Sequence, residues 1–211
     1  MAVRGRPKGS DSAVTKEKII NAARVEFAAN GFDGAGIVSI AENVDIAPSA
    51  IYHYFQSKEK LYVEVFESTA SAIWDSVFPA ENHSTLVEAV EQLLDNSRRL
   101  AHKLPAHSDF LASLPIEAKL HPQFSEILKQ RAVYQDKTFR NLALLGVQTG
   151  ELHFLSEDEG TELIRSIIMG WFFEKHFRRE EIEHSADAII SMFKYLYATN
   201  PNNNNLAIGN Y

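Results

Sequence analysis

The stretch IVSIAENVDIAPSAIYHYF, residues 37–55, predicts two short helices joined by a tight turn. Apolar residues first recur with the spacing of one helical face, at Ile37, Ile40, Ala41 and Val44. Asp45 then marks a turn, because aspartate tolerates the left-handed conformation, and Pro48 suits the first turn of a new helix. Ile51 and Phe55 give the second helix its inward side. The pattern favours a helix-turn-helix and leaves an ordinary αα-hairpin of a helical bundle open.

The flanking sequence carries further spaced motifs. Residues 13–32 read AVTKEKIINAARVEFAANGF, with Phe-x-x-x-Gly-Phe at the end of the first predicted helix. Ile-Ala follows at 40–41, Ile-Tyr-x-Tyr-Phe at 51–55 and Ser-Lys-Glu-x-Leu at 57–61. In order and separation, these elements resemble the N-terminal DNA-binding domain of the TetR family of bacterial repressors. The resemblance covers residues 13 to 66, under a third of the chain.

The resemblance implies an all-α fold, with an N-terminal three-helix helix-turn-helix domain and a larger C-terminal helical domain for ligand binding and dimerisation, about nine helices. Residues 1–12 are basic and rich in Gly and Pro, so we expect a flexible arm. The DNA-binding domain then covers 13–57 and the effector-binding and dimerisation domain 58–199. Residues 200–211, with their asparagine run, are expected to be a disordered tail.

Charge is unevenly distributed along the chain. The formal net charge is −7, but residues 1–60 hold eight Lys and Arg against seven Asp and Glu, whereas the remainder holds thirteen against twenty-one. The first part can therefore meet phosphate although the whole chain is acidic. The sequence contains no run of about 18 apolar residues, so we expect no transmembrane helix. We also expect a cytoplasmic protein with no membrane partner.

Helix boundaries follow from capping residues, prolines and glycines. Thr15 is the expected N-cap of the first helix and Gly31 its end. Thr85-x-x-Glu88 and Ser156-x-x-Glu159 are capping boxes that open helices near 86–104 and after 156. A long helix is expected from Phe124 to Thr149, ended by Gly150, and Pro115 is expected to break the helix before it.

The sequence departs from the family pattern at two helix starts. The second helix follows Ala35-Gly36, where the family usually has a Thr/Ser pair, and the reading helix follows Ala47, where Ser or Thr is usual. Each lost cap should cost on the order of 1 kcal/mol. We therefore expect a DNA-free domain that is looser than those of its relatives.

The resemblance assigns DNA contacts to three sets of residues. The arm would contribute Arg4, Arg6 and Lys8, following the backbone or entering the minor groove. Base-facing positions are Val38, Pro48, Ser49, Ala50 and Tyr52. Backbone contacts are expected from Ser39, Tyr52, His53, Tyr54 and Lys58. Because no base-facing residue is Arg, Lys, Asn or Gln, we expect contacts with thymine methyl groups, an A·T-rich half-site and readout of DNA shape.

The helices that usually enclose a ligand in this family are rich in aromatic residues. The expected ligand-binding residues are Trp74, Phe78, His107, Phe110, Met169, Phe172, Phe173 and His176, which suit a small hydrophobic or aromatic molecule. Most aromatic residues at helical spacing belong to the core, and this alternative stays open. The eight histidines show no metal-ligand spacing, the chain has no cysteine, and no catalytic triad stands out. We therefore expect no enzyme activity, metal or cofactor.

The last two predicted helices are apolar on more than one side. A fully buried helix pair within one protomer explains this, and so does a four-helix interface between two copies, which the resemblance implies. The expected dimer residues are Ile164, Ile168, Trp171, Ile189, Phe193 and Tyr197. The resulting hypothesis is a homodimeric repressor that binds a pseudo-palindromic operator in double-stranded DNA and is released by a hydrophobic effector. The alternative is a DNA-binding protein without a small-molecule effector, regulated by a protein partner or architectural.

Overall fold

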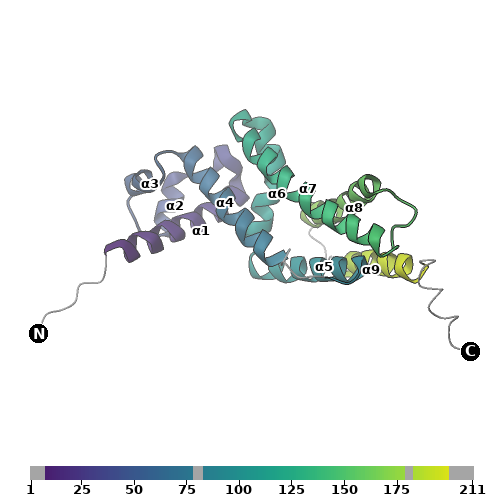
Figure 1. Ribbon diagram of the computed structural model, residues 1–211. Coiled ribbons are helices and arrows are strands. Elements are labelled where there is room, and N and C mark those ends of the chain that lie inside the picture. Colours follow the sequence, from purple (N-terminus) through teal and green to yellow (C-terminus); the bar gives the residue numbers. More distant parts are fainter. Residues whose placement is uncertain (1–7, 78–82, 179–182, 200–211) are drawn as a thin grey trace, which may run out of the picture. The chain divides into compact units, whose positions relative to one another are not determined.

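The computed structural model describes residues 8–77, 83–178 and 183–199, with the side chains of 8–11, 75, 175–178 and 183 outside that description. Over these ranges the protein is all-helical, with nine α-helices and one short 3-10 helix (Figure 1), which confirms the predicted fold class. The helices are α1 (Lys8–Gly34), α2 (Ile37–Asn43), α3 (Pro48–Phe55), α4 (Lys58–Val77), α5 (Leu86–Lys103), α6 (Pro105–Leu120), η1 (Pro122–Phe124), α7 (Ser125–Gln148), α8 (Glu157–Arg178) and α9 (Glu183–Ala198). None of these described helices is long and apolar enough to cross a bilayer.

The helices form two compact units that interleave along the sequence. Unit 1 consists of Met1–Ala72 and Leu104–Leu128, and unit 2 of Ile73–Lys103 and Lys129–Tyr211. The first unit therefore contains α6 and most of α4 beside the helix-turn-helix. These packing units cut across the expected functional division between residues 57 and 58, which stays a prediction.

Two expectations about α1 need correction. The helix begins at Lys8, so residues 8–12 of the expected arm belong to it and Thr15 lies inside it rather than at its N-cap. Gly31 interrupts the helix with φ 68°, as expected for a residue that ends one. A side chain there would also lie 2.6 Å from Oε1 of Glu117 on α6. The backbone conformation therefore requires glycine, whereas the flexible end of the Glu117 side chain could move aside.

The core of unit 1 is aromatic. Tyr62 on α4 contacts Phe27 on α1, Phe110 on α6 and Phe124 in η1, with ring centroids 5.0, 5.1 and 4.4 Å away. Phe32 at the end of α1 lies 4.9 Å from Phe124. Each such pair contributes about 0.5–1.5 kcal/mol beyond area burial. The rings thus hold α1, α4 and α6 together behind the helix-turn-helix.

A buried guanidinium also ties α1 to α4. Arg24, 2% exposed, donates from Nε to Oγ1 of Thr69 at 2.7 Å and from Nη2 to Oγ of Ser68 at 3.0 Å. Its Nη1 donates to Oδ1 of Asn21 at 2.6 Å. These acceptors are all neutral, so burial lowers the pKa of Arg24. The clamp orders α4 over α1 through hydrogen bonds rather than ion pairing.

Pro115 does not break its helix, contrary to our expectation. α6 runs without interruption from Pro105 to Leu120. Phe110, Leu111 and Leu114 are buried, and α6 packs along α1. This packing outweighs the loss of one backbone hydrogen bond at the proline.

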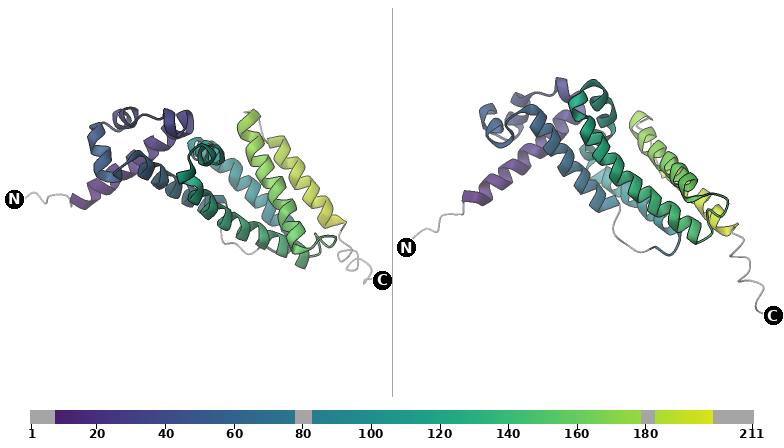
Figure 2. Two further views of the ribbon diagram at one scale, coloured as in Figure 1. Left: turned by 90° about the horizontal axis from the view of Figure 1, so that it is seen from above. Right: turned by 45° about the horizontal axis from the view of Figure 1, so that its top comes forward.

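Unit 2 has its own apolar core, formed by α5, α7, α8 and α9. α5 packs against α9, and α8 and α9 lie side by side (Figure 2). Its buried side chains include Leu86, Leu94, Phe139, Ile164, Trp171 and Phe193. Gly146 and Gly160 pack against Leu152, which closes the turn between α7 and α8. That turn includes Gly150, whose φ of 79° ends α7 as expected.

The start of α5 is capped both locally and from a distance. The Glu88 N–H donates to Oγ1 of Thr85 at 3.3 Å, as the predicted capping box requires, and the return bond goes from the Ser84 N–H to Glu88 at 3.1 Å. The buried carboxylate of Glu151 accepts the N–H groups of Leu86 and Val87 at 2.7 and 2.9 Å. A residue beyond α7 thus completes the first turn of α5.

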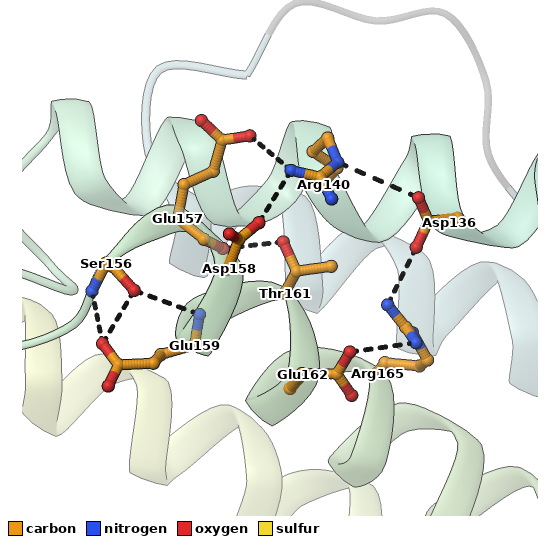
Figure 3. Close-up of polar contacts among 9 residues, drawn as sticks. All are labelled: Asp136, Arg140, Ser156, Glu157, Asp158, Glu159, Thr161, Glu162 and Arg165. Carbon is orange, nitrogen blue, oxygen red and sulfur yellow. Dashed lines mark hydrogen bonds and ion pairs between the residues drawn. The ribbon is translucent and has the colours of Figure 1, made fainter.

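Charged side chains join α7 to the first turns of α8 (Figure 3). Arg140 Nη1 lies 3.1 Å from Glu157 and 2.9 Å from Asp158, and Asp136 accepts from Arg165 at 2.9 Å. The neighbouring capping box is closed, with the Ser156 N–H 2.9 Å from Glu159 and the Glu159 N–H 3.3 Å from Ser156 Oγ. The negative charge of the Glu159 carboxylate also interacts favourably with the positive N-terminal end of the α8 helix dipole.

His107 on α6 should make the stability of the protein depend on pH. Burial, and then the charge of Arg24, lowers the pKa of His107 to about 4. The unfolded chain gains this proton near pH 6.5 and the folded chain only near pH 4, so the free energy of unfolding falls as pH drops through that window. When the pH is lowered from 7 to 5, the free energy of unfolding of His107→Gln, measured with urea, should therefore fall by about 1–2 kcal/mol less than that of the wild type.

His184→Gln provides the matched control, because His184 is exposed on α9. This variant should lose as much stability as the wild type over the same pH range. Equal losses for His107→Gln and the wild type would contradict the assignment of this acid sensitivity to His107.

Candidate DNA-binding interface

Two short helices meet at a tight turn in unit 1. Asp45, with φ 56°, provides the left-handed residue predicted for this turn. The N–H of Val44 donates to the Ala41 carbonyl at 3.2 Å, and that of Ile46 donates to the same carbonyl at 3.1 Å. The turn therefore folds back on the last residues of α2 and directs the chain into α3, as a helix-turn-helix requires.

α3 is anchored on one side and exposed on the other. Ile51 and Phe55 are 1% and 3% exposed and fix the helix to the core. The opposite side exposes Pro48, Ser49, Tyr52 and His53, while Ala50 and Tyr54 are half-buried. Val38 on α2 is 56% exposed and Tyr52 on α3 47%. The expected base-facing residues are thus available at the surface.

The residue types at the two ends of α3 and at the start of α4 explain the local structure there. Ala47, the N-cap of α3, makes no side-chain hydrogen bond, and Pro48 at the first position removes one N–H that would need a partner. At the C-terminal end, Gln56 adopts φ 64°. Ser57 then caps α4, accepting the Lys60 N–H at 3.2 Å as predicted.

The start of α2 differs from our expectation. Gly36 is the N-cap and makes no side-chain cap, but the Glu26 carboxylate on α1 accepts the Gly36 N–H at 3.1 Å. The hydroxyl of Ser39 donates to the same carboxylate at 2.9 Å. The lost hydroxyl cap is therefore compensated from another helix. The role of Glu26 was not predicted. The sequence does offer a signal for it: a glutamate lies near the end of α1, and Ala35-Gly36 leaves the start of α2 without a hydroxyl cap.

The remaining expected DNA-contacting residues are basic side chains of the N-terminal arm and of α4. Lys58 donates to the Asp33 carbonyl at 3.3 Å and lies 4.9 Å from the centroid of the Phe32 ring. Arg4 and Arg6 lie outside the described residues, and Lys8 belongs to α1 with its side chain outside the description. Lys58 thus stabilises the end of α1.

The expected ligand-binding residues fall into both units. Phe110 is fully buried in the aromatic core of unit 1, and His107 lies on the same helix. In unit 2, Trp74 lies 6.1 Å from Tyr134 between ring centroids. The others in unit 2 are half-buried on α8, namely Met169, which accepts from Gln135 at 3.5 Å, and the adjacent rings of Phe172 and Phe173. Phe78 and the side chain of His176 lie outside the description.

Most of the expected dimer residues lie inside the protomer. Ile164, Ile168, Trp171 and Phe193 are 0–5% exposed and belong to the core of unit 2. These side chains therefore pack in the core formed with α5 and α9 of the same chain. Of the expected set, only the half-buried Ile189 and the exposed Tyr197 are accessible to a second copy.

Comparison with known proteins agrees with this geometry. Residues 19–65, which span α1 to α4, match the model of the family "Bacterial regulatory proteins, tetR family". The chain is 26% identical to the HTH-type transcriptional regulator UidR of Escherichia coli K12 over 123 residues, 58% of this chain and 61% of UidR. It is 36% identical to the HTH-type transcriptional repressor AcnR of Corynebacterium jeikeium over 61 residues, 28% of this chain and 32% of AcnR. These matches span less than two thirds of either relative.

The fold likeness extends further than the sequence likeness. The crystal structure of AibR in complex with isovaleryl coenzyme A and operator DNA has a TM-score of 0.68 to this chain at 16% identity. It covers 84% of this chain and 97% of AibR. The helix-turn-helix geometry, the family match and the shared fold agree. Residues 19–65 thus carry a helix-turn-helix domain of the tetR family of bacterial regulatory proteins, and the chain as a whole is similar in fold to AibR.

Proposed function

We propose that this protein is a sequence-specific transcriptional repressor that binds a pseudo-palindromic operator as a homodimer and is released by a small hydrophobic or aromatic molecule. The exposed side of α3, fixed by the buried Ile51 and Phe55, carries this proposal. A short helix held in this way presents its outer residues to the major groove. The similarity to AcnR, which is a transcriptional repressor, supports repression rather than activation.

The chemistry of the exposed side favours apolar contacts with bases. Val38, Pro48 and Ala50 carry no hydrogen-bonding side chain, whereas the methyl group of thymine offers an apolar contact in the major groove. Tyr52 and His53 supply polar atoms for phosphates or base edges. The proposed half-site is therefore A·T-rich, with part of its specificity coming from DNA shape.

Charge supports binding through the N-terminal part. The eight Lys and Arg among residues 1–60 nearly balance seven acidic residues, while the rest of the chain has thirteen basic against twenty-one acidic residues. An acidic remainder repels phosphate and so favours contact through the helix-turn-helix.

A dimer follows from the symmetry of a pseudo-palindrome, since each half-site needs one copy of α3. α9 exposes an apolar row, Ala188, Met192 and Tyr195, at helical spacing. On α8, a side chain at Gly170 would meet nothing within 4 Å, so a partner helix can approach closely there. We propose these exposed sides of α8 and α9 as the dimer interface.

An effector is supported by the aromatic residues of unit 2 and by one structural neighbour. AibR was crystallised with isovaleryl coenzyme A, and half-buried aromatic side chains such as Trp74, Phe172 and Phe173 suit an apolar ligand. Such a ligand releases DNA only if it binds the DNA-free arrangement of the dimer more tightly than the DNA-bound one.

The proposed function predicts selection of an A·T-rich inverted repeat from a random duplex library. Affinity for it, measured by fluorescence anisotropy, should fall steeply with salt, because phosphate contacts release counterions. Tyr52→Ala should weaken binding by about tenfold. Phe154→Ala removes a similarly exposed ring in the α7–α8 turn and should bind like the wild type.

Replacing thymine by uracil in the selected site tests the apolar contacts directly. Loss of the methyl groups should weaken the wild type at the contacted positions, and Val38→Ala should be less sensitive to the replacement. Failure to bind any duplex at low salt would reject the repressor. Binding without sequence preference would reject this reading surface and favour the architectural alternative.

The proposed dimer interface predicts that a charge on the exposed side of α9 separates the protomers. Met192→Glu should convert the dimer to a monomer in sedimentation experiments, since an unpaired carboxylate is costly in an apolar interface. Val133→Glu places the same charge on a more exposed apolar residue of α7 and should remain dimeric. A dimeric Met192→Glu variant would place the interface elsewhere.

The proposed effector site predicts that an acyl-CoA or an aromatic acid releases the selected duplex. The chain has two tryptophans, so Trp171→Phe leaves Trp74 as the sole indole reporter. Its fluorescence should change with the same concentration dependence as DNA release, and Phe173→Ala should weaken both by about tenfold. A panel of such compounds without effect on DNA binding would favour regulation by a protein partner.

A further inference from the structure

The first turn of α2 has no cap of its own. Gly36 adopts φ −100° and ψ 124°, the backbone of an ordinary N-cap, but it has no side chain to accept the orphan N–H groups of the first turn. α2 has only seven residues, and its buried anchors are Ile40 and Ala41. So short a helix depends on contacts from elsewhere for its position.

Glu26 on α1 supplies these contacts. Its Oε1 accepts the Gly36 N–H at 3.1 Å, and its Oε2 accepts the Ser39 hydroxyl at 2.9 Å. Asn30, one turn further along α1, donates to Oε1 at 3.1 Å and fixes the carboxylate. The hydrogen bond from Gly36, followed by those from Ser39 and Asn30 and the charge of Lys58, lowers the pKa of Glu26 against its partial desolvation.

We propose that Glu26 is a positioning residue for DNA recognition: its carboxylate sets the position of α2, and through the turn at Asp45 that of α3. This inference rests on the proposed function, because it concerns the same reading surface. Capping from α1 takes the place of a local hydroxyl cap and links the reading pair to the aromatic core behind it.

The same geometry reassigns Ser39. A serine hydroxyl has one proton, and Ser39 donates it to Glu26. A phosphate offers only acceptors, so Ser39 cannot donate to DNA while this bond is intact. The Glu26 carboxylate would also repel a phosphate placed at the start of α2. Ser39 is thus part of the anchor, and the backbone contacts of DNA fall to α3 and α4.

The chain offers a direct rescue experiment. A Cβ added at Gly36 would lie 3.7 Å from Cβ of Ser39 and 4.0 Å from Oε1 of Glu26, which are ordinary contacts. Gly36→Ser therefore introduces the missing local cap without strain. Glu26→Ala removes the anchor, Glu26→Gln keeps its hydrogen-bonding shape, and Glu17→Ala removes an exposed charge from the same helix as the control.

Affinity for the selected duplex is measured for each variant, together with thermal unfolding and the amide chemical shifts of Val38 and Ser39 in the first turn of α2. Glu26→Ala should weaken binding by roughly five- to tenfold. Glu17→Ala and Glu26→Gln should stay within about threefold of the wild type, because neither breaks the cap geometry. Adding Gly36→Ser to Glu26→Ala should restore most of the affinity, because the new hydroxyl can accept the N–H of Val38 or Ser39.

Glu26→Ala that binds as tightly as Glu17→Ala would overturn the inference. A weakened Glu26→Ala that Gly36→Ser does not rescue would also overturn it, because general destabilisation would then explain the loss. The wild type itself separates the two proposals: if it binds no duplex, the proposed function fails and the positioning role fails with it, whereas normal wild-type binding with an unaffected Glu26→Ala rejects only the positioning role.

Discussion

The ring of Tyr62 lies among four other aromatic rings, those of Phe27, Phe32, Phe110 and Phe124, at centroid distances of 4.4–5.5 Å. These residues come from α1, α6 and η1, so one side chain of α4 fixes three other elements. Burial raises the pKa of Tyr62 and keeps the phenol neutral. α1 in turn carries Glu26, which holds α2. The positions of α2 and α3 therefore depend on packing that lies behind them.

Features encoded within a few residues were predictable from the sequence. The turn at Asp45, the cap at Ser57 and the box at Ser156 each need only neighbouring side chains, and each is present. Features that depend on distant parts of the chain were not predictable in the same way. The core positions of Ile164 and Trp171 depend on α5 and α9, and the continuity of α6 at its proline depends on α1. Periodicity identifies an apolar side but not the chain that covers it.

Two helix starts are completed by carboxylates from other segments. Glu26 caps α2 across ten residues, and Glu151 caps α5 across sixty-five and sixty-four. A local cap stabilises a helix wherever that helix lies, whereas a distant cap stabilises it only in its native position. The distant arrangement therefore fixes the orientation of the helix as well as stabilising it. Because both glutamates lie far along the chain from the helices they cap, no capping pattern beside those helices indicates them.

The interleaving of the two units constrains the order in which they form during synthesis. Unit 1 requires Leu104–Leu128, yet α5 of unit 2 is made first. A nascent chain ending at residue 72 lacks Phe110 and Phe124, so the apolar surfaces of Phe27 and Tyr62 remain uncovered. The aromatic core behind the helix-turn-helix is complete only after α6 and η1 have left the ribosome, and the first turn of α5 lacks Glu151 until α7 has been made. The cores of the two units are thus completed together during synthesis.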